Sequence, residues 1–225
     1  MIRNARLANV FSLEYEQADV AVARGIIVGV GDGYVGKETI DASGKVLIPG
    51  MIDGHVHVES SMLTPRRFAE AVVPLGTAAV MADPHEIANV WGKSGIVAMK
   101  QNAQDLPMDF FWAAPSCVPA SDFETCREPL GAAELEGLFD QATCQHLGEM
   151  MNFPAVIAGN TDVWSKLAAA ADRPLTGHAP GVIGKELCAY LLSGCLADHE
   201  TVGYAEGLEK IRRGGWLMMR AGAAS

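Results

Sequence analysis

The sequence lacks the patterns that mark several common classes of protein. Its five cysteines are odd in number and include no C-x-x-C pair, which argues against a disulfide framework and against a cysteine-ligated zinc site. No run approaches the ~20 apolar residues needed to span a bilayer, and the apolar segment from Leu187 to Ala197 is too short. The N-terminus carries Arg3 and Arg6 within its apolar residues, which is atypical of a signal peptide. We therefore expect a cytoplasmic protein that has no membrane partner.

Positive charge is also scarce. Seventeen Lys and Arg residues against 27 Asp and Glu residues give a net charge of -10, so a nucleic acid is not an expected partner. The 225 residues, 49% of them hydrophobic, suffice for one large domain or two small ones with a real core. This balance is ordinary for a soluble enzyme.

Residues 1–48 have the pattern of short strands. Ile2 to Val10 reads as one strand, and Ala18 to Val30 alternates around Arg24-Gly25 in the manner of a hairpin. Pro49-Gly50 then interrupts the pattern. We therefore predict a small all-β, sandwich-type module over residues 1–48, with no chemistry of its own.

Residues 49–225 show a different pattern, in which short apolar strands alternate with amphipathic helices. This alternation is typical of βα units and a parallel sheet. About seven such strands can be counted, the last of them beginning at Trp216. Because a complete (β/α)8 barrel needs ~250 residues, we predict an α/β fold that is an incomplete TIM-like (β/α)8 barrel without an eighth strand.

The stretch from Pro49 to His57, PGMIDGHVH, carries two histidines one residue apart. In an extended strand His55 and His57 point to the same side, where two imidazoles can hold one metal ion. The alternative is a half-buried strand whose histidines only form hydrogen bonds. The motif by itself does not decide between them.

Other polar residues follow the later strands at corresponding places. Glu149 lies near the end of the fourth strand, His178 ends the fifth and His199 ends the sixth. The C-terminal ends of barrel strands converge on one mouth, where such folds keep their active sites. Four imidazoles and a bridging carboxylate can hold two divalent cations. We therefore predict that His55, His57, Glu149, His178 and His199 are metal ligands.

The segment Asp83-Pro84-His85-Glu86, at the end of the second strand, allows two interpretations. It can bring an acid/base pair to the same mouth, or it can cap the following helix. We include His85 and Glu86, together with Glu149, as candidate catalytic residues. His146 stands three residues before Glu149, so strand alternation predicts that it faces the other way and is not a ligand.

These motifs resemble a known family. PGMIDGHVH after a small β module is similar to the start of the metal-dependent amidohydrolase superfamily. The longer motifs resemble the prokaryotic adenine deaminase family: HVHVESSMLTP (55–65), ADPHEIANVWG (82–92), PSCVPAS (115–121), LGEMMNFP (147–154), GHAPG (177–181) and DHE (198–200). The match covers essentially the whole chain. The H-x-E and P-C-x-x-C pattern of the cytidine deaminase class is absent.

The resemblance implies hydrolysis of adenine to hypoxanthine and ammonia by a metal-bound hydroxide at a site with two divalent metal ions. Manganese or iron is implied before zinc, Glu149 takes the bridging place, and the DPHE motif lies near the substrate. In the superfamily an aspartate at the end of strand eight ligates one metal and moves the proton. Because that strand is absent here, we expect the chain to be the N-terminal part of such an enzyme, with full activity depending on the missing part.

Two other functions stay open. One is an amidohydrolase that acts on a related purine or a cyclic amide, because a metal site alone does not choose its substrate. The other is a truncated remnant that binds metal without activity. The DPHE and LGEMMN stretches favour adenine as the small-molecule substrate. An exposed barrel edge would also encourage self-association into a homo-oligomer.

Overall fold

The computed structural model describes residues 1–121 and 123–220. The chain divides into two compact units, Met1–Gly50 and Met51–Ser225. The second unit holds every residue predicted above to take part in chemistry.

The first unit is a small β-sheet. Its strand order is β3-β2-β1-β4, and β5 also pairs with β1. The strands are β1 (Ile2–Asn9), β2 (Glu14–Ala23), β3 (Ile26–Val30), β4 (Ile40–Asp41) and β5 (Val46–Leu47). The turn between β2 and β3 consists of Arg24 (φ 52°) and Gly25 (φ 77°). Two successive positive φ angles are what a two-residue hairpin loop requires, so the predicted hairpin is confirmed.

The second unit is built on seven strands in the order β12-β11-β10-β9-β8-β7-β6. Every neighbouring pair is parallel, and each strand lies beside the next one along the chain. The strands are β6 (Met51–Val56), β7 (Thr77–Ala82), β8 (Asp109–Ala114), β9 (His146–Met150), β10 (Leu175–Gly177), β11 (Ala197–Asp198) and β12 (Trp216–Leu217). The predicted incomplete (β/α)8-type barrel is confirmed.

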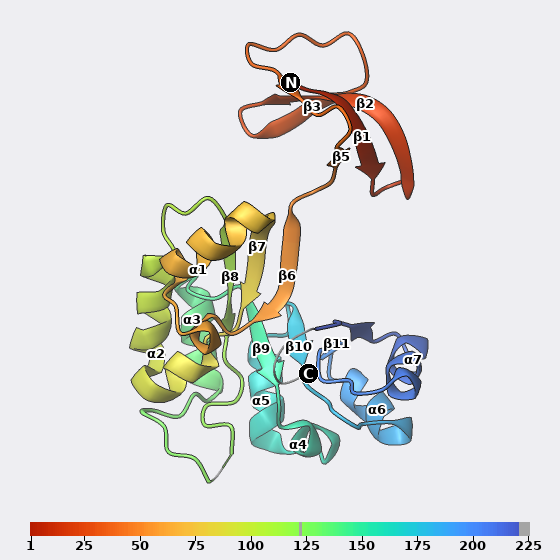
Figure 1. Ribbon diagram of the computed structural model, residues 1–225. Helices are drawn as coiled ribbons and strands as arrows, with labels where there is room; N and C mark the ends of the chain where they lie inside the picture. The colour runs from red at the N-terminus through yellow and green to blue at the C-terminus, as the bar shows by residue number, and fades with distance from the viewer. Residues whose placement is uncertain (122, 221–225) are drawn as a thin grey trace. The chain divides into compact units, whose positions relative to one another are not determined.

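Helices connect these strands and lie around the sheet, as Figure 1 shows for α2, α6 and α7. The α-helices are α1 (Pro65–Val72), α2 (His85–Asn102), α3 (Ala132–Asp140), α4 (Phe153–Ile157), α5 (Thr161–Ala169), α6 (Gly184–Leu191) and α7 (Tyr204–Arg212). Two short 3-10 helices are η1 (Val58–Ser61) and η2 (Val73–Leu75). The five-residue helix α4 was not predicted, although Asn152 caps it by accepting a hydrogen bond from the Ala155 N–H.

The core of this unit lies between the strands and the helices. Helix α3 shows the pattern, since Leu135, Leu138 and Phe139 are all buried at helical spacing. Leu147 and Trp112 extend the core from the sheet. Burial of one such side chain contributes roughly 1.5–3 kcal/mol, so the core fixes the strand ends that carry the polar residues.

Helix α2 is broken near its middle. Gly92 has φ 65° and ψ -156°, outside the helical region. Glu128 holds the break, because its Oε1 accepts a hydrogen bond from the Lys93 N–H at 2.8 Å and its carboxylate fills the space beside Gly92. The Arg127 N–H donates to the carbonyl of Asn89 at 2.8 Å. The first turns of α2 are therefore held by the segment that follows β8.

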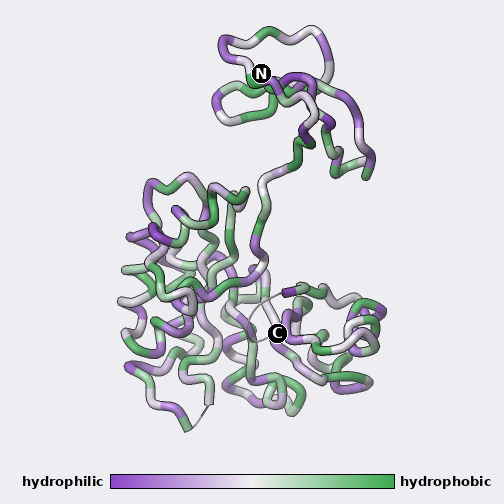
Figure 2. The backbone as a smooth tube through the Cα atoms, in the orientation of Figure 1, coloured by the Kyte–Doolittle hydropathy of each residue, from purple (hydrophilic) through white to green (hydrophobic). Residues whose placement is uncertain are grey.

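Hydrophobic and hydrophilic stretches alternate along the chain (Figure 2). Within residues 1–121 and 123–220, no helix is both long enough and apolar enough to cross a membrane.

Candidate metal centre and active site

The five predicted metal ligands stand at corresponding places in the sheet. His55 lies in β6 and His57 directly after it, Glu149 lies in β9, and His178 and His199 directly follow β10 and β11. The structure brings all five together around the carboxylate of Glu149, whose side chain is only 3% exposed. The strand ends therefore converge as the sequence predicts.

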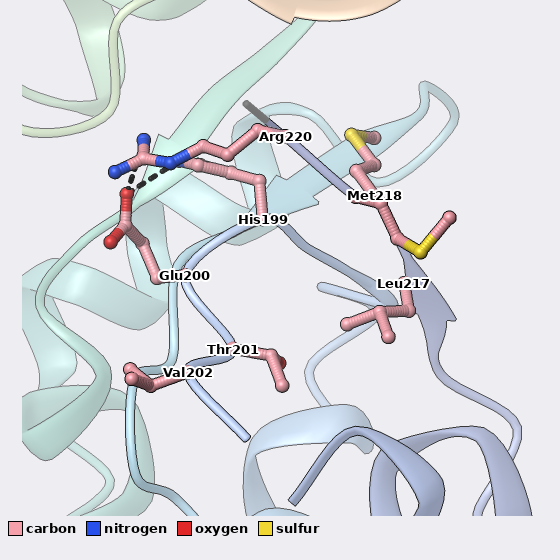
Figure 3. A pocket seen from close by; sticks show the side chains of 8 residues that line it. His199, Glu200, Thr201, Val202, Leu217, Met218 and Arg220 are labelled. Atoms are coloured by element: carbon pink, nitrogen blue, oxygen red, sulfur yellow. Dashed lines mark ion pairs between the residues drawn. The ribbon is translucent and has the colours of Figure 1, made fainter. Parts of the chain in front are cut away.

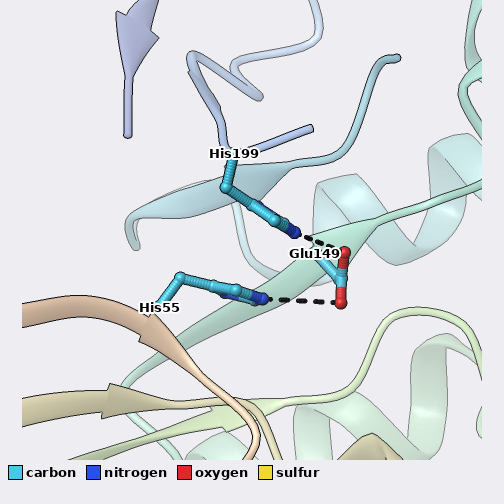
Figure 4. A group of neighbouring side chains, drawn as sticks. All are labelled: His55, Glu149 and His199. Carbon is cyan, nitrogen blue, oxygen red and sulfur yellow. Dashed lines mark ion pairs between the residues drawn. The ribbon is translucent and has the colours of Figure 1, made fainter. Parts of the chain in front are cut away.

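The two carboxylate oxygens of Glu149 face different histidines. Oε1 lies 3.5 Å from His55 Nε2 and 3.0 Å from His57 Nε2. Oε2 lies 2.6 Å from His178 Nδ1 and 3.1 Å from His199 Nε2. Figure 4 shows His55 and His199 approaching Glu149 in this way. Each oxygen of this carboxylate thus faces two imidazoles, and the rings of His55 and His199 stack with their centroids 3.9 Å apart.

A backbone carbonyl on the side away from Glu149 fixes the orientation of the His57 ring. Its Nδ1 lies 2.8 Å from the backbone carbonyl of Asp83. Because a carbonyl only accepts, Nδ1 carries a proton, and in the neutral ring the lone pair is on Nε2. That Nε2 lies 3.1 Å from the Nε2 of His55. Two ring nitrogens this close need either a proton or a cation between them.

The electrostatics of the cluster agree with this geometry. Burial would lower the pKa of His57, but the carboxylates of Glu149 and Asp83 raise it to about 9. Burial would raise the pKa of Glu149, yet hydrogen bonds with His178, His199, His55 and His57 hold it far below its usual range. Without a metal, therefore, a proton on His57 offsets the charge of Glu149.

The donor set fits divalent cations. Imidazole nitrogens and a carboxylate are ligands that suit zinc, iron and manganese. A carboxylate can bridge two ions when each of its oxygens faces a different pair of imidazoles, as the two oxygens of Glu149 do. The Nε2 atoms of His55 and His57 lie 3.1 Å apart, close enough for both to bind one ion. The use of a divalent metal is therefore supported by the residues present.

Asp83 and His85 extend the cluster. The buried Asp83 carboxylate accepts a hydrogen bond from the Glu149 N–H through Oδ2 at 2.8 Å. Its Oδ1 lies 3.6 Å from His85 Nδ1, which is also 3.6 Å from Glu149 Oε1. Within the described residues, neither Asp83 Oδ1 nor His85 Nδ1 has a hydrogen-bond partner, although both are buried. Burial would lower the pKa of His85, but Asp83 raises it.

Glu86, the other predicted acid/base residue, lies at the edge of the cluster. Its Oε1 accepts a hydrogen bond from Ser60 Oγ at 2.6 Å. With His85 it lines a pocket of about 410 Å³. The structure thus brings His85 close to Glu149 and leaves Glu86 beside the adjoining pocket.

A second pocket, of about 390 Å³, lies beside His199 (Figure 3). Glu200 lines it with Oε1 at 3.6 Å from His199 Nε2 and at 2.7 Å from Arg220 Nη1. The ligand set predicted from the sequence did not include Glu200 or Asp83, yet each groups with two histidines at metal-binding distances. Asp83 directly follows β7, and Glu200 lies two residues after the end of β11. This position at a strand end is the sequence signal from which both could have been predicted.

The predicted orientation of His146 is wrong. Between Leu147 and Met150, β9 contains one residue more than its partner β10, so the strand has a bulge. Gly148 faces the Asp83 carboxylate, and strand alternation places His146 on that same face. The bulge lets Glu149 turn toward the cluster as well. His146 is buried, and burial lowers its pKa to about 4, so it is neutral.

A parallel (β/α) barrel with imidazoles and a carboxylate at its strand ends offers the ligands that a metal-dependent hydrolase uses. Comparison with known proteins specifies the class further. Residues 46–224 match the model of the amidohydrolase family. The chain belongs to that family.

The chain is similar to curated adenine deaminases. It is 44% identical over 225 residues to an adenine deaminase of Archaeoglobus fulgidus. It is 48% identical over 224 residues to one of Dehalococcoides mccartyi. Each match covers 100% of this chain but only 40% and 39%, respectively, of the relative. The chain therefore spans about 40% of the length of these relatives.

Solved structures show the same fold at low identity. Atrazine chlorohydrolase TrzN from Arthrobacter aurescens, in complex with zinc, has a TM-score of 0.63 at 17% identity, over 96% of this chain and 64% of the other. D-hydantoinase from Bacillus sp. AR9 has a TM-score of 0.60 at 17% identity, over 96% and 55%. At this identity the likeness extends to the fold alone.

Proposed function

We propose that this chain carries the histidine-rich part of an adenine deaminase active site, which hydrolyses adenine to hypoxanthine and ammonia. The proposal is carried by one observation: four histidines gather around the buried carboxylate of Glu149 in a chain that is similar to adenine deaminases over its whole length. Full activity is proposed to need residues that lie in the part of the relatives that this chain does not match.

The cluster is proposed to hold two divalent ions. His55 and His57 would hold one ion, His178 and His199 would hold the other, and Glu149 would contribute to both. When bound, such ions lower the pKa of water and supply a nucleophile near neutral pH. Manganese or iron is proposed before zinc, and the metal content of the purified protein would decide between them.

The protein's own residues position the reactants. Asp83 holds the Glu149 backbone and, through its carbonyl, the ring of His57. His85, whose Nδ1 has no hydrogen-bond partner among the described residues and lies 3.6 Å from Glu149 Oε1, is proposed to hold or transfer a proton beside Glu149. Glu86 is proposed to contact the substrate from the pocket that it shares with His85. Glu149 would serve both as a ligand and as a catalytic carboxylate.

Two further statements belong to the same proposal. We propose a cytoplasmic location, which suits the proposed reaction on a small soluble base. Self-association is proposed because β6 and β12 are the outer strands of the described sheet.

The test is ammonia release from adenine by the metal-loaded chain, with metal content measured on the same sample. A full-length relative provides the positive control, and H55A and H178A provide matched negative controls. We expect about two ions per chain, fewer ions in each variant, and a release of ammonia from adenine that is slower than that of the full-length relative and depends on both histidines. Unchanged metal content in a folded H55A or H178A variant would refute the ligand assignment. Turnover of another purine or a cyclic amide, but not of adenine, would refute the substrate.

A further inference from the structure

Helix α7 carries a lysine that is almost completely buried. Lys210 is 2% exposed, and its Nζ donates hydrogen bonds to the Ala179 carbonyl (2.7 Å), Asp198 Oδ2 (2.9 Å) and Glu206 Oε1 (2.6 Å), with Thr201 Oγ1 at 3.1 Å. A buried ammonium group is tolerated only where its charge and its protons are satisfied. Its place in the fold therefore depends on these four oxygens.

Two of these oxygens belong to direct neighbours of the predicted ligands. Ala179 follows His178, and Asp198 precedes His199. Asp198 Oδ1 also accepts a hydrogen bond from the Ala179 N–H at 2.8 Å. Ala179 is thus held at its N–H by Asp198 and at its carbonyl by Lys210. The ends of β10 and β11 are joined beside the two histidines.

Glu206 extends the connection along the same loop. Its Oε1 accepts a hydrogen bond from the Gly181 N–H at 2.9 Å as well as from Lys210. Burial alone would raise the pKa of Asp198, but the hydrogen bonds from Thr201, the Ala179 N–H and Lys210 lower it. Removal of the lysine charge would leave the carboxylates of Asp198 and Glu206 without their cation.

The other half of the cluster has different support. His57 is held by the Asp83 carbonyl, and Asp83 also binds the Glu149 N–H. None of the hydrogen bonds of Lys210 reaches that side of Glu149. The lysine is therefore connected to the half of the cluster that faces Glu149 Oε2.

We propose that Lys210 is a positioning residue that fixes the spacing of His178 and His199 and thereby sets the affinity for the ion on their side of Glu149. The inference rests on the proposed two-ion function. Groups that orient metal ligands from behind typically change metal affinity by about 10–100-fold when they are mutated.

The experiment titrates metal-free protein with Mn²⁺ and follows each binding step. In K210M we expect one of the two dissociation constants to rise by about 10–100-fold, while the other stays at its wild-type value. K210R, which keeps the charge, should recover part of the loss. The matched control is K100M, because Lys100 also donates to two backbone carbonyls, those of Ala142 and Thr143, but on a different side of the unit. K100M should leave both constants unchanged.

Hydrogen exchange of the metal-free protein tests the positioning without the metal. In K210M, peptides that cover residues 175–182 and 197–202 should exchange faster, while the peptide over residues 51–58 should not change. If the wild-type chain binds fewer than two ions, the proposed function fails, and the exchange result alone decides the positioning role. If K210M does not fold, E206Q is measured in its place. It should again raise one of the two dissociation constants and leave the other unchanged, but by a smaller factor. Equal weakening of both ions, or wild-type exchange and wild-type affinities in a folded variant, would overturn the inference.

Discussion

The contact between Gly148 and Asp83 permits a sharp test of how the cluster is built. A Cβ at position 148 would lie 2.4 Å from Asp83 Oδ2 and 2.9 Å from its Cγ. Asp83 is buried at 2% exposure and uses the same Oδ2 to bind the Glu149 N–H. G148A therefore forces a buried carboxylate to move away from the backbone of a predicted ligand.

The expected cost follows from two effects. Overpacking of a tight interior site costs about 1–3 kcal/mol. Weakening a buried hydrogen bond to a charged group costs about 1.5–3 kcal/mol. We expect G148A to lower the free energy of unfolding by about 2.5–6 kcal/mol, a large part of the ~5–15 kcal/mol that stabilises a typical domain. Metal content should fall in parallel, since Glu149 is displaced.

Urea unfolding followed by tryptophan fluorescence is a suitable assay, because all four tryptophans lie in residues 91–216 of the second unit. G137A is the matched control. Gly137 lies in α3, and a Cβ there would meet no atom within 4 Å. Its replacement by alanine should instead stabilise the helix by about 0.5–1 kcal/mol.

A double-mutant cycle assigns the cost of G148A to its cause. In a D83A background the clashing carboxylate is gone, so G148A should cost less than about 1 kcal/mol, and the coupling energy should exceed about 1.5 kcal/mol. The reasoning is refuted if the free energy of unfolding of G148A lies within about 0.5 kcal/mol of the wild-type value. It is also refuted if G148A lowers the free energy of unfolding as much in the D83A background as in the wild type.

Two further predictions concern stability. The pKa of His146 falls from 6.5 to about 4 on folding. Below pH 6.5 the unfolded chain binds a proton that the folded chain does not, so the free energy of unfolding falls as the pH drops from 6.5 toward 4, by up to about 3 kcal/mol. H146Q should therefore lose less stability than the wild type over this window in metal-free urea unfolding, and parallel losses would contradict the assignment. Asn160 caps α5 by accepting a hydrogen bond from the Val163 N–H at 3.1 Å, so N160A should cost about 1 kcal/mol and N160D much less. An unchanged urea midpoint in N160A would argue against the cap.

The five clustered residues could be predicted because their signal is local. Each follows or ends a short apolar strand, and parallel strands in a barrel bring such ends together. His55 and His57 needed only the two-residue repeat of a strand. The convergence on Glu149 then followed from the fold class.

The supports behind the cluster could not be read from the sequence, because they depend on pairings between distant residues. The hydrogen bond between Asp83 and the Glu149 backbone joins residues 66 positions apart. Lys210 lies in a helix with charged neighbours, where the sequence pattern indicates a solvated face. His146 was misplaced because one extra residue in β9 breaks the strand repeat, and a bulge leaves no clear signal in a five-residue strand.

The break in α2 at Gly92 gives this site a modular construction. The short first part of α2 carries His85 and Glu86, and the segment after β8 holds it through Arg127 and Glu128. The four imidazoles, in contrast, stand at the ends of β6, β10 and β11. Changes at positions 124–128 of the segment after β8 would therefore reshape the pocket beside His85, whereas Ser116 has to be kept, because its Oγ donates a hydrogen bond to the Glu149 carbonyl at 2.6 Å. In engineering terms, the shape of that pocket could be varied through these positions, with metal content as the measure of an undisturbed cluster.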